Sequence, residues 1–268
     1  MRPTPDILVV DGTAEVIMSG ESVEILPEAH PWSAEGSRVG VLVVHGFTGN
    51  PSSMRGLAEA FAEAGYSVEL PRLPGHGTTV EDMITTGWPD WSGEAEAALS
   101  RLQQRTDVQF VAGLSMGGAL TVWLATRHPE LSGIICINAA VGVQEEMVAG
   151  VKAMVEAGQS VMDGLGSDIA DPEVTESAYD QTPLVPMLSF FEGLSGFNND
   201  LARISQPVLI LNSPQDHVVP PADSDLLAES VSGPVERVTL ERSYHVATQD
   251  YDKDLIIEKA LDFVSRNS

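Results

Sequence analysis

Short apolar runs alternate with helix-like segments along most of this chain. Four runs are apolar at nearly every position, a pattern typical of strands covered on both faces: VGVLVV (39–44), VQFVAG (108–113), GIICIN (133–138) and PVLILN (207–212). Two further strands are expected at 66–70 and 235–240, and helices at 52–64, 91–105, 116–127, 222–230 and 253–266. The alternation predicts an α/β fold with a mostly parallel central sheet and helices on both faces.

Two stretches depart from this alternation. The first 36 residues carry two short apolar runs and then the Pro- and Gly-punctuated LPEAHPWSAEGS, which indicates an irregular lead-in. Between about 141 and 197, Met147, Val151 and Met154 recur at helical spacing, and the sequence after them is apolar but broken by Pro and Gly. We therefore expect one domain over 1–268, with a small cap inserted over the sheet at about 141–197.

Composition narrows the classes of partner. The chain has 268 residues, 43% of them hydrophobic, and 14 basic against 39 acidic residues give a net charge of −25. Such a charge repels nucleic acid phosphates and anionic lipid headgroups, so no nucleic acid partner is expected. No apolar run approaches the roughly 20 residues of a membrane span, and the N-terminus lacks a signal-peptide pattern. We expect a cytoplasmic protein without stable membrane insertion, whose oligomeric state the sequence leaves open.

Metal and cofactor chemistry find little support in the sequence. The lone cysteine, Cys136, lies in an apolar strand and is expected to be a core thiol. The spacing of His, Cys and carboxylate residues does not suggest a metal site. A dinucleotide or phosphate loop is disfavoured, because neither G-x-G-x-x-G nor Gly-Lys-Ser/Thr follows the strand at 108–113. No metal or cofactor is therefore expected.

The segment GLSMGG (113–118) contains the clearest candidate for chemistry. Ser115 has a glycine two positions before it and two positions after it, between a predicted strand and a predicted helix. A nucleophile elbow has this context, because the sharp strand-to-helix turn crowds the neighbouring backbone and leaves room only for glycine beside it. We therefore predict that Ser115 is the nucleophile of a hydrolase rather than part of a plain glycine-rich turn.

A serine nucleophile needs a histidine base oriented by a carboxylate, in the chain order Ser, acid, His. His245 lies in the loop after the last predicted strand, at the sheet edge where catalytic loops gather, and is the preferred base. Asp216 follows the strand at 207–212 in a proline-rich loop and is the preferred acid. Asp223 and Asp225 are the alternatives, but they begin the following helix and have a capping or helix-dipole explanation. His217 is expected to be a structural or rim residue.

The oxyanion formed during ester hydrolysis needs two backbone N–H donors. Met116 follows the nucleophile and would supply one of them. The loop HGFTG (45–49) follows an early strand and offers the Phe47 N–H as the second, with Gly46 and Gly49 letting the loop fold back. The simpler interpretation of this loop is a turn, but its occurrence with a nucleophile, acid and base in the right order favours the oxyanion role.

Several of these segments together resemble the bacterial monoacylglycerol lipases, close relatives of small bacterial carboxylesterases in the α/β-hydrolase fold. In chain order they are VLVVHGFTG (41–49), YSVELPRLPGHGT (66–78), GLSMGG (113–118), INAAV (137–141), DHVVPP (216–221) and YHVATQDYDK (244–253). The resemblance runs from about Val16 to the C-terminus. It implies the same triad and the same oxyanion donors as the interpretation from the residues.

The resemblance also implies a small cap with an apolar tunnel for one acyl chain and a polar end for glycerol. At the polar end it places Glu176, whose carboxylate would accept hydrogen bonds from glycerol hydroxyls, with Leu165 and Asn138 nearby. The alternative for Glu176 is a solvated glutamate on a helix face. Four cap methionines could line the tunnel or be plain core: Met147, Met154, Met162 and Met187.

The expected function is that of a serine esterase that hydrolyses monoacylglycerols to glycerol and free fatty acid through an acyl-enzyme. Its partner would be a small lipid ester substrate. The alternative among enzymes is a carboxylesterase for short-chain or aromatic esters, which would need no glycerol-binding carboxylate. A non-catalytic binding protein of the same fold is disfavoured, because such proteins usually lack part of the triad.

Overall fold

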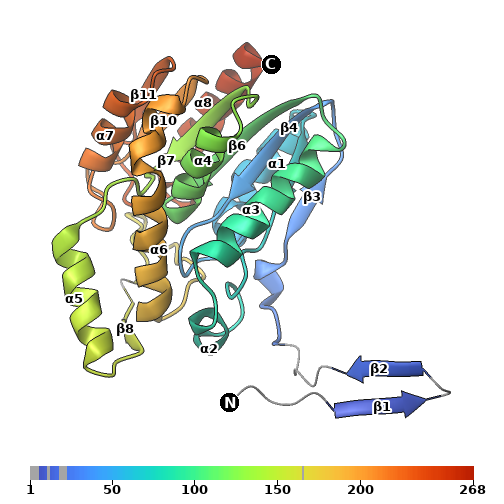
Figure 1. The fold of residues 1–268 in the computed structure, drawn as a ribbon. Helices are drawn as coiled ribbons and strands as arrows, with labels where there is room; N and C mark the ends of the chain where they lie inside the picture. Colours follow the sequence, from blue (N-terminus) through green and yellow to red (C-terminus); the bar gives the residue numbers. More distant parts are fainter. Residues whose placement is uncertain (1–5, 11–12, 18–22, 165) are drawn as a thin grey trace.

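The central element of the fold is a seven-stranded sheet with the order β11-β10-β7-β6-β4-β5-β3 (Figure 1). The computed structural model describes residues 6–10, 13–17, 23–164 and 166–268. The strands are β3 (Trp32–Ala34), β4 (Val39–Val44), β5 (Ser67–Leu70), β6 (Val108–Leu114), β7 (Gly133–Ile137), β10 (Val208–Asn212) and β11 (Val235–Thr239). Every neighbouring pair is parallel except β3 and β5, which are antiparallel.

Helices cover both faces of this sheet because its strands are apolar on both sides. Along β4, Leu42 and Val44 belong to one hydrophobic cluster and Val41 and Val43 to another, as the two-residue period of a strand requires. The first cluster packs under α3 (Trp88–Gln103), α4 (Met116–Arg127) and α7 (Ala222–Ser230). The second packs under α1 (Ser52–Glu63) and α8 (Lys253–Asn267). The α/β fold with a mostly parallel sheet, predicted from the sequence, is confirmed.

The N-terminal lead-in is more regular than predicted. Its residues Trp32–Ala34 form β3, which pairs with the edge of the sheet, and β1 (Asp6–Val10) pairs with β2 (Thr13–Ile17). A three-residue edge strand depends on its neighbour rather than on its own sequence, so periodicity does not reveal it. The structure also contains α2 (Val80–Ile84) and the short 3₁₀ helices η1 (Pro27–Ala29), η2 (Asn198–Arg203) and η3 (Ala247–Gln249).

The segment between β7 and β10, here called the inserted segment (141–197), holds two helices and a small hairpin. These are α5 (Glu145–Glu156), β8 (Val161–Asp163), β9 (Gln181–Pro183) and α6 (Leu184–Phe197). Figure 1 shows α5, β8 and α6 gathered at one end of the sheet. The sequence predicts α5 but not α6, since Pro186 suggests a break. Pro186 is tolerated because it lies in the first helical turn, where its missing N–H has no intrahelical acceptor to lose.

Gly193 explains how α6 comes to lie against α3. A Cβ atom at Gly193 would be 2.2 Å from the Trp88 ring, so the backbone of α6 rests directly on that indole. The Trp88 ring is also stacked on Phe190 and Phe197, at centroid distances of 6.1 and 5.9 Å. The glycine that suggests a broken helix is thus a packing contact.

Among the described residues, no helix is both long enough and apolar enough to cross a membrane.

We predict opposite effects of alanine at two glycines of α6. Gly193→Ala should lower the free energy of unfolding by roughly 1–3 kcal/mol, because the methyl group overlaps Trp88. Gly196→Ala meets nothing within 4 Å and should raise it by about 0.5–1 kcal/mol, because alanine favours helix. Urea unfolding of both variants beside the parent chain measures this. Equal effects of the two substitutions would contradict the packing described here.

Candidate active site

Ser115 lies on a strained turn between β6 and α4. Its backbone has φ 56° and ψ −118°, a conformation that residues other than glycine rarely adopt. The turn is held at both ends, since the Ser115 N–H donates to Ile137 O at 3.0 Å and its carbonyl accepts from Ala119 N at 3.0 Å. This places the hydroxyl at the carboxyl edge of the sheet, at the N-terminus of α4.

The glycines of the motif are required by close backbone contacts. A Cβ atom at Gly117 would be 2.2 Å from Val44 O, and one at Gly113 would be 2.1 Å from Gly117 O. No side chain fits at either position without moving the start of α4 away from β4. The sharp turn and the two glycines therefore form one unit, as the sequence predicts.

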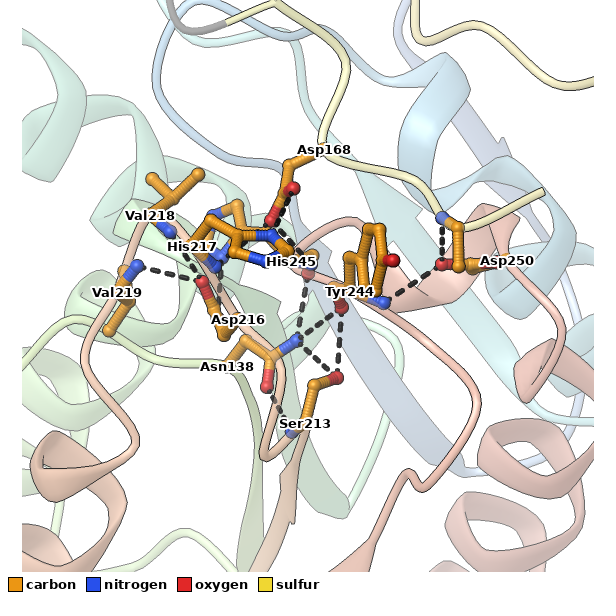
Figure 2. A network of polar contacts seen from close by, with 11 residues as sticks. Asn138, Asp168, Ser213, Asp216, His217, Val218, Val219, Tyr244, His245 and Asp250 are labelled. Carbon is orange, nitrogen blue, oxygen red and sulfur yellow. Dashed lines mark hydrogen bonds and ion pairs between the residues drawn. The ribbon is translucent and has the colours of Figure 1, made fainter. Parts of the chain in front are cut away.

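Asp216 and His245 form a buried pair (Figure 2), and His245 lines the same cavity as Ser115. His245 Nδ1 and Asp216 Oδ2 are 2.8 Å apart, and the two side chains are only 8% and 2% exposed. Asp216 Oδ1 accepts hydrogen bonds from the N–H groups of Val218 and Val219, both at 2.8 Å. The carboxylate is thus fixed on both oxygens, and it orients the imidazole with Nδ1 protonated.

Asp223, one of the two alternative candidates for the acid, makes contacts elsewhere. Asp223 Oδ2 accepts from Val141 N at 2.7 Å and from Gly142 N at 2.8 Å, so it fastens the start of the inserted segment to α7. Burial raises the pKa of this carboxyl above its usual value. His217, beside Asp216, donates from its backbone to Asp168 and pairs with the same carboxylate through its ring.

The predicted oxyanion loop after β4 is held by a buried histidine, His45. His45 Nδ1 lies 2.9 Å from Gly46 O, and its Nε2 lies 3.1 Å from Leu73 N. A carbonyl only accepts and a backbone N–H only donates, so His45 is neutral with its proton on Nδ1. Burial lowers the pKa of His45 well below its usual value, in agreement with this assignment.

The two predicted oxyanion donors come from the start of α4 and from the loop after β4, whose Gly46 lies against Ser115. Met116 is the first residue of α4, so its N–H has no acceptor within the helix. Phe47 lies in the pocket wall, and its ring packs 5.6 Å from Trp91 and 6.1 Å from Phe190. Both N–H groups come from elements whose positions are set by Gly117 and His45.

A cavity of about 360 Å³ opens beside Ser115 and His245, within the size range of small-molecule sites. The inserted segment supplies much of its wall. All four methionines singled out in the sequence line it: Met147, Met154, Met162 and Met187. Phe190, Phe191 and Leu194 of α6 add further apolar surface. The wall therefore suits a flexible hydrocarbon chain.

Glu176 brings a carboxylate to this otherwise apolar wall. It lines the same cavity as Ser115 and His245, and a Cβ atom at Gly49 would be 2.8 Å from its Oε1. Burial raises the pKa of Glu176 to about 7, and the charge of His245 opposes that rise. The residue is half-buried and forms part of the cavity wall.

The other two residues that the resemblance places near glycerol differ from Glu176. Leu165 lies outside the described residues. Asn138 is 3% exposed and is absent from the cavity wall. Its amide donates to Ser213 Oγ at 3.0 Å and to His245 O at 2.8 Å, and it accepts from Ser213 N at 2.8 Å (Figure 2). Because these bonds occupy both ends of the amide, Asn138 supports the His245 loop instead of meeting a ligand.

Two acidic residues near His245 are not predicted by the sequence analysis. Asp168 of the inserted segment lines the cavity, and Asp250 follows η3. Asp250 accepts from Tyr244 N at 2.9 Å and from Ala170 N at 2.7 Å (Figure 2). Asp250 lies within YHVATQDYDK (244–253), but the segment alone does not show which backbone groups its carboxylate accepts from. Asp168 stands in no motif and lies 77 positions from His245, so no sequence signal could identify it.

Comparisons with known proteins agree with this geometry. A protein-family model described as "Serine aminopeptidase, S33" matches residues 36–252. A thermostable monoacylglycerol lipase from Bacillus sp. (strain H-257) is 46% identical over 249 residues, which cover 92% of this chain and 99% of that lipase. A carboxylesterase from Bacillus subtilis (strain 168) is 25% identical, over 88% of this chain and 96% of that enzyme. The solved structure of a metagenome-derived lipolytic enzyme has a TM-score of 0.88 at 45% identity, covering 91% of this chain and 100% of that one.

These likenesses extend over nearly the whole chain and are not confined to the Ser115 turn. Although the family description names an aminopeptidase, the relatives matched over most of the chain are ester hydrolases. The resemblance to bacterial monoacylglycerol lipases, predicted from the sequence, is confirmed. The chain therefore belongs to the serine aminopeptidase S33 family of the α/β-hydrolase superfamily, and within it this protein is a carboxylic ester hydrolase.

Proposed function

We propose that this protein hydrolyses monoacylglycerols, with Ser115 as nucleophile, His245 as general base and Asp216 as the carboxylate that orients it. The observation that carries the proposal is the site itself: a serine on a strained turn and a buried His–Asp pair meet one apolar cavity that also holds a carboxylate. The 46% identity to a monoacylglycerol lipase supports the same substrate class.

In the proposed mechanism, His245 Nε2 takes the proton of Ser115 as the serine oxygen bonds to the ester carbonyl carbon. The carbonyl oxygen becomes an oxyanion, which the N–H groups of Phe47 and Met116 stabilise. The imidazolium is stabilised by Asp216, which accepts the hydrogen bond from Nδ1.

The intermediate then collapses. The bond between the carbonyl carbon and the glycerol oxygen breaks, and His245 donates its proton to that oxygen, so that glycerol leaves and an acyl-enzyme remains. Water repeats the sequence with His245 again as base, which releases the fatty acid and regenerates Ser115. No cofactor is required for either half of the reaction.

The cavity supports a preference for esters with one acyl chain. Its methionine-rich wall suits the acyl chain, while Glu176 suits the two free hydroxyls of the glycerol moiety. A di- or triacylglycerol would place hydrocarbon beside the Glu176 carboxylate in place of a hydroxyl donor. Such a substrate would bind less tightly, because a carboxylate shielded from water without a hydrogen bond raises the free energy of the complex. An alkyl or aromatic ester would leave the same carboxylate without a partner.

We further propose that the inserted segment acts as a cap within a single domain. Support comes from its position between β7 and β10 and from the cavity wall it supplies.

We also predict a cytoplasmic location, which cell fractionation can test, and no nucleic acid partner.

We predict that activity depends on Ser115 and falls with the number of acyl chains. Fatty-acid release is titrated from mono-, di- and trilauroylglycerol and from a short p-nitrophenyl ester. Release should be confined largely to the monoester among the glycerides, and Ser115→Ala should lower kcat by about 10⁴-fold or more on every substrate.

The panel also separates the two enzyme classes. Rapid turnover of the p-nitrophenyl ester with little release from monolauroylglycerol would contradict the proposed substrate and indicate a carboxylesterase. Full activity of Ser115→Ala would contradict the proposed nucleophile.

We predict that Glu176 makes glycerol recognition depend on pH. Its raised pKa, about 7, means that the ionised form, which accepts stronger hydrogen bonds, prevails only above that pH. The ratio of kcat/KM for monolauroylglycerol to kcat/KM for methyl laurate should therefore rise by about tenfold from about pH 6 to 8. Taking the ratio removes any pH dependence that the two substrates share.

Substitutions of two glutamates in one loop complete this test. Glu176→Gln should flatten the pH dependence of the ratio, and Glu176→Ala should lower the ratio at about pH 8 by roughly 10- to 100-fold. Glu173→Gln, at an exposed position of the same loop, should match the parent chain. A ratio that Glu176→Ala leaves unchanged would exclude a glycerol contact.

A further inference from the structure

Asp168 connects the inserted segment to the backbone of His245. Its Oδ2 accepts from His245 N at 3.1 Å, and its backbone carbonyl accepts from Val246 N at 3.1 Å. The side chain is only 14% exposed, and it lines the cavity. A residue of the inserted segment thus takes two consecutive N–H groups of the loop that carries the predicted base.

The same carboxylate also holds the loop of the predicted acid. Asp168 Oδ2 accepts from His217 N at 3.1 Å, and its Oδ1 lies 2.8 Å from His217 Nδ1 (Figure 2). His217 directly follows Asp216. One oxygen of Asp168 therefore bridges the backbone beside the acid and the backbone of the base, in addition to the contact between Asp216 and His245.

The remaining backbone groups of the His245 loop are held from the core. Asn138 donates to the carbonyl of His245 at 2.8 Å, and Ser213 Oγ donates to the carbonyl of Tyr244 at 2.8 Å. Asp250 accepts from Tyr244 N. The core thus holds the two carbonyls and one N–H, whereas the N–H of His245 itself depends on Asp168.

We propose that Asp168 is a positioning residue for ester hydrolysis: its carboxylate sets the place of the His245 imidazole relative to Asp216 and Ser115. The proposal rests on the roles proposed above for these three residues. It means that the inserted segment completes the catalytic machinery in addition to lining the substrate cavity. A displacement of about 1 Å in such a group lowers rates by up to about 100-fold.

Two conservative substitutions separate geometry from charge. Asp168→Asn removes the charge, but its amide oxygen can accept from both backbone N–H groups while its NH₂ faces His217 Nδ1. Asp168→Glu keeps the charge but moves the carboxylate by one methylene group. If Asp168 acts by position, the asparagine variant should retain activity and the glutamate variant should lose it.

The experiment measures kcat and KM for p-nitrophenyl butyrate, which reports on the triad without glycerol recognition. We expect Asp168→Ala and Asp168→Glu to lower kcat by about 10- to 100-fold with KM changed less than about threefold, and Asp168→Asn to stay within about threefold of the parent. Asp163→Ala, at an exposed acidic residue of the same segment, is the matched control and should be unchanged. Thermal unfolding verifies that each variant is folded, and Asp168→Glu carries the test if Asp168→Ala does not fold.

The outcomes separate this inference from the proposed function. A folded Asp168→Glu variant with the kcat of the parent would overturn the positioning role. Equal losses in Asp168→Asn and Asp168→Glu would overturn it as well, because charge rather than position would then be required. If the parent chain itself lacks esterase activity, or if Ser115→Ala retains it, the proposed function fails instead.

Discussion

The backbone turn at Ser115 is the constraint on which the rest of the site depends. A conformation with φ 56° and ψ −118° costs on the order of 1–3 kcal/mol, and it persists only where the surroundings hold it. Here β7 and the first turn of α4 hold it by hydrogen bonds, while Gly117 lets α4 approach the carbonyl of Val44. The same approach leaves the Met116 N–H free at the start of a helix, where an anion is favoured.

Carboxylates near His245 differ in how their burial is compensated. Asp216 accepts two backbone N–H groups and the imidazole, and Asp168 accepts two backbone N–H groups and pairs with His217. Glu176 is half-buried, burial raises its pKa to about 7, and the charge of His245 opposes that rise. The first two therefore act as fixed parts of the frame, while Glu176 has acceptor capacity left for a ligand.

The inserted segment has two physically different parts. Its stretch 168–179 is bound to the loops that carry His245 and Phe47. Asp168 accepts from His245 N, Tyr179 N donates to Thr48 O at 3.2 Å, and Asn50 donates to Ser177 O at 2.7 Å. Helix α5, in contrast, buries only Val151 among its residues and presents two partly exposed methionines to the cavity. The stretch 168–179 is therefore fixed in place by hydrogen bonds, while α5 adds a flexible apolar wall to the cavity.

Much of this protein is determined locally and is therefore visible in the sequence. Strands that are apolar at nearly every position must be buried on both faces, and this predicts a sheet with helices on both sides. The glycines around Ser115 predict a turn in which neighbouring backbones lie close together. The order of Ser115, Asp216 and His245 along parallel strands brings them to one edge, because carboxyl ends of parallel strands meet there. Helix α6, the contacts of Asp168 and the place of Asn138 were decided only in the tertiary structure. In the sequence Gly193 suggests a helix break, and only the packed structure shows that it makes room for Trp88. The hydrogen-bond partner of Asp168 lies 77 positions away along the chain, so only the folded chain brings the two together.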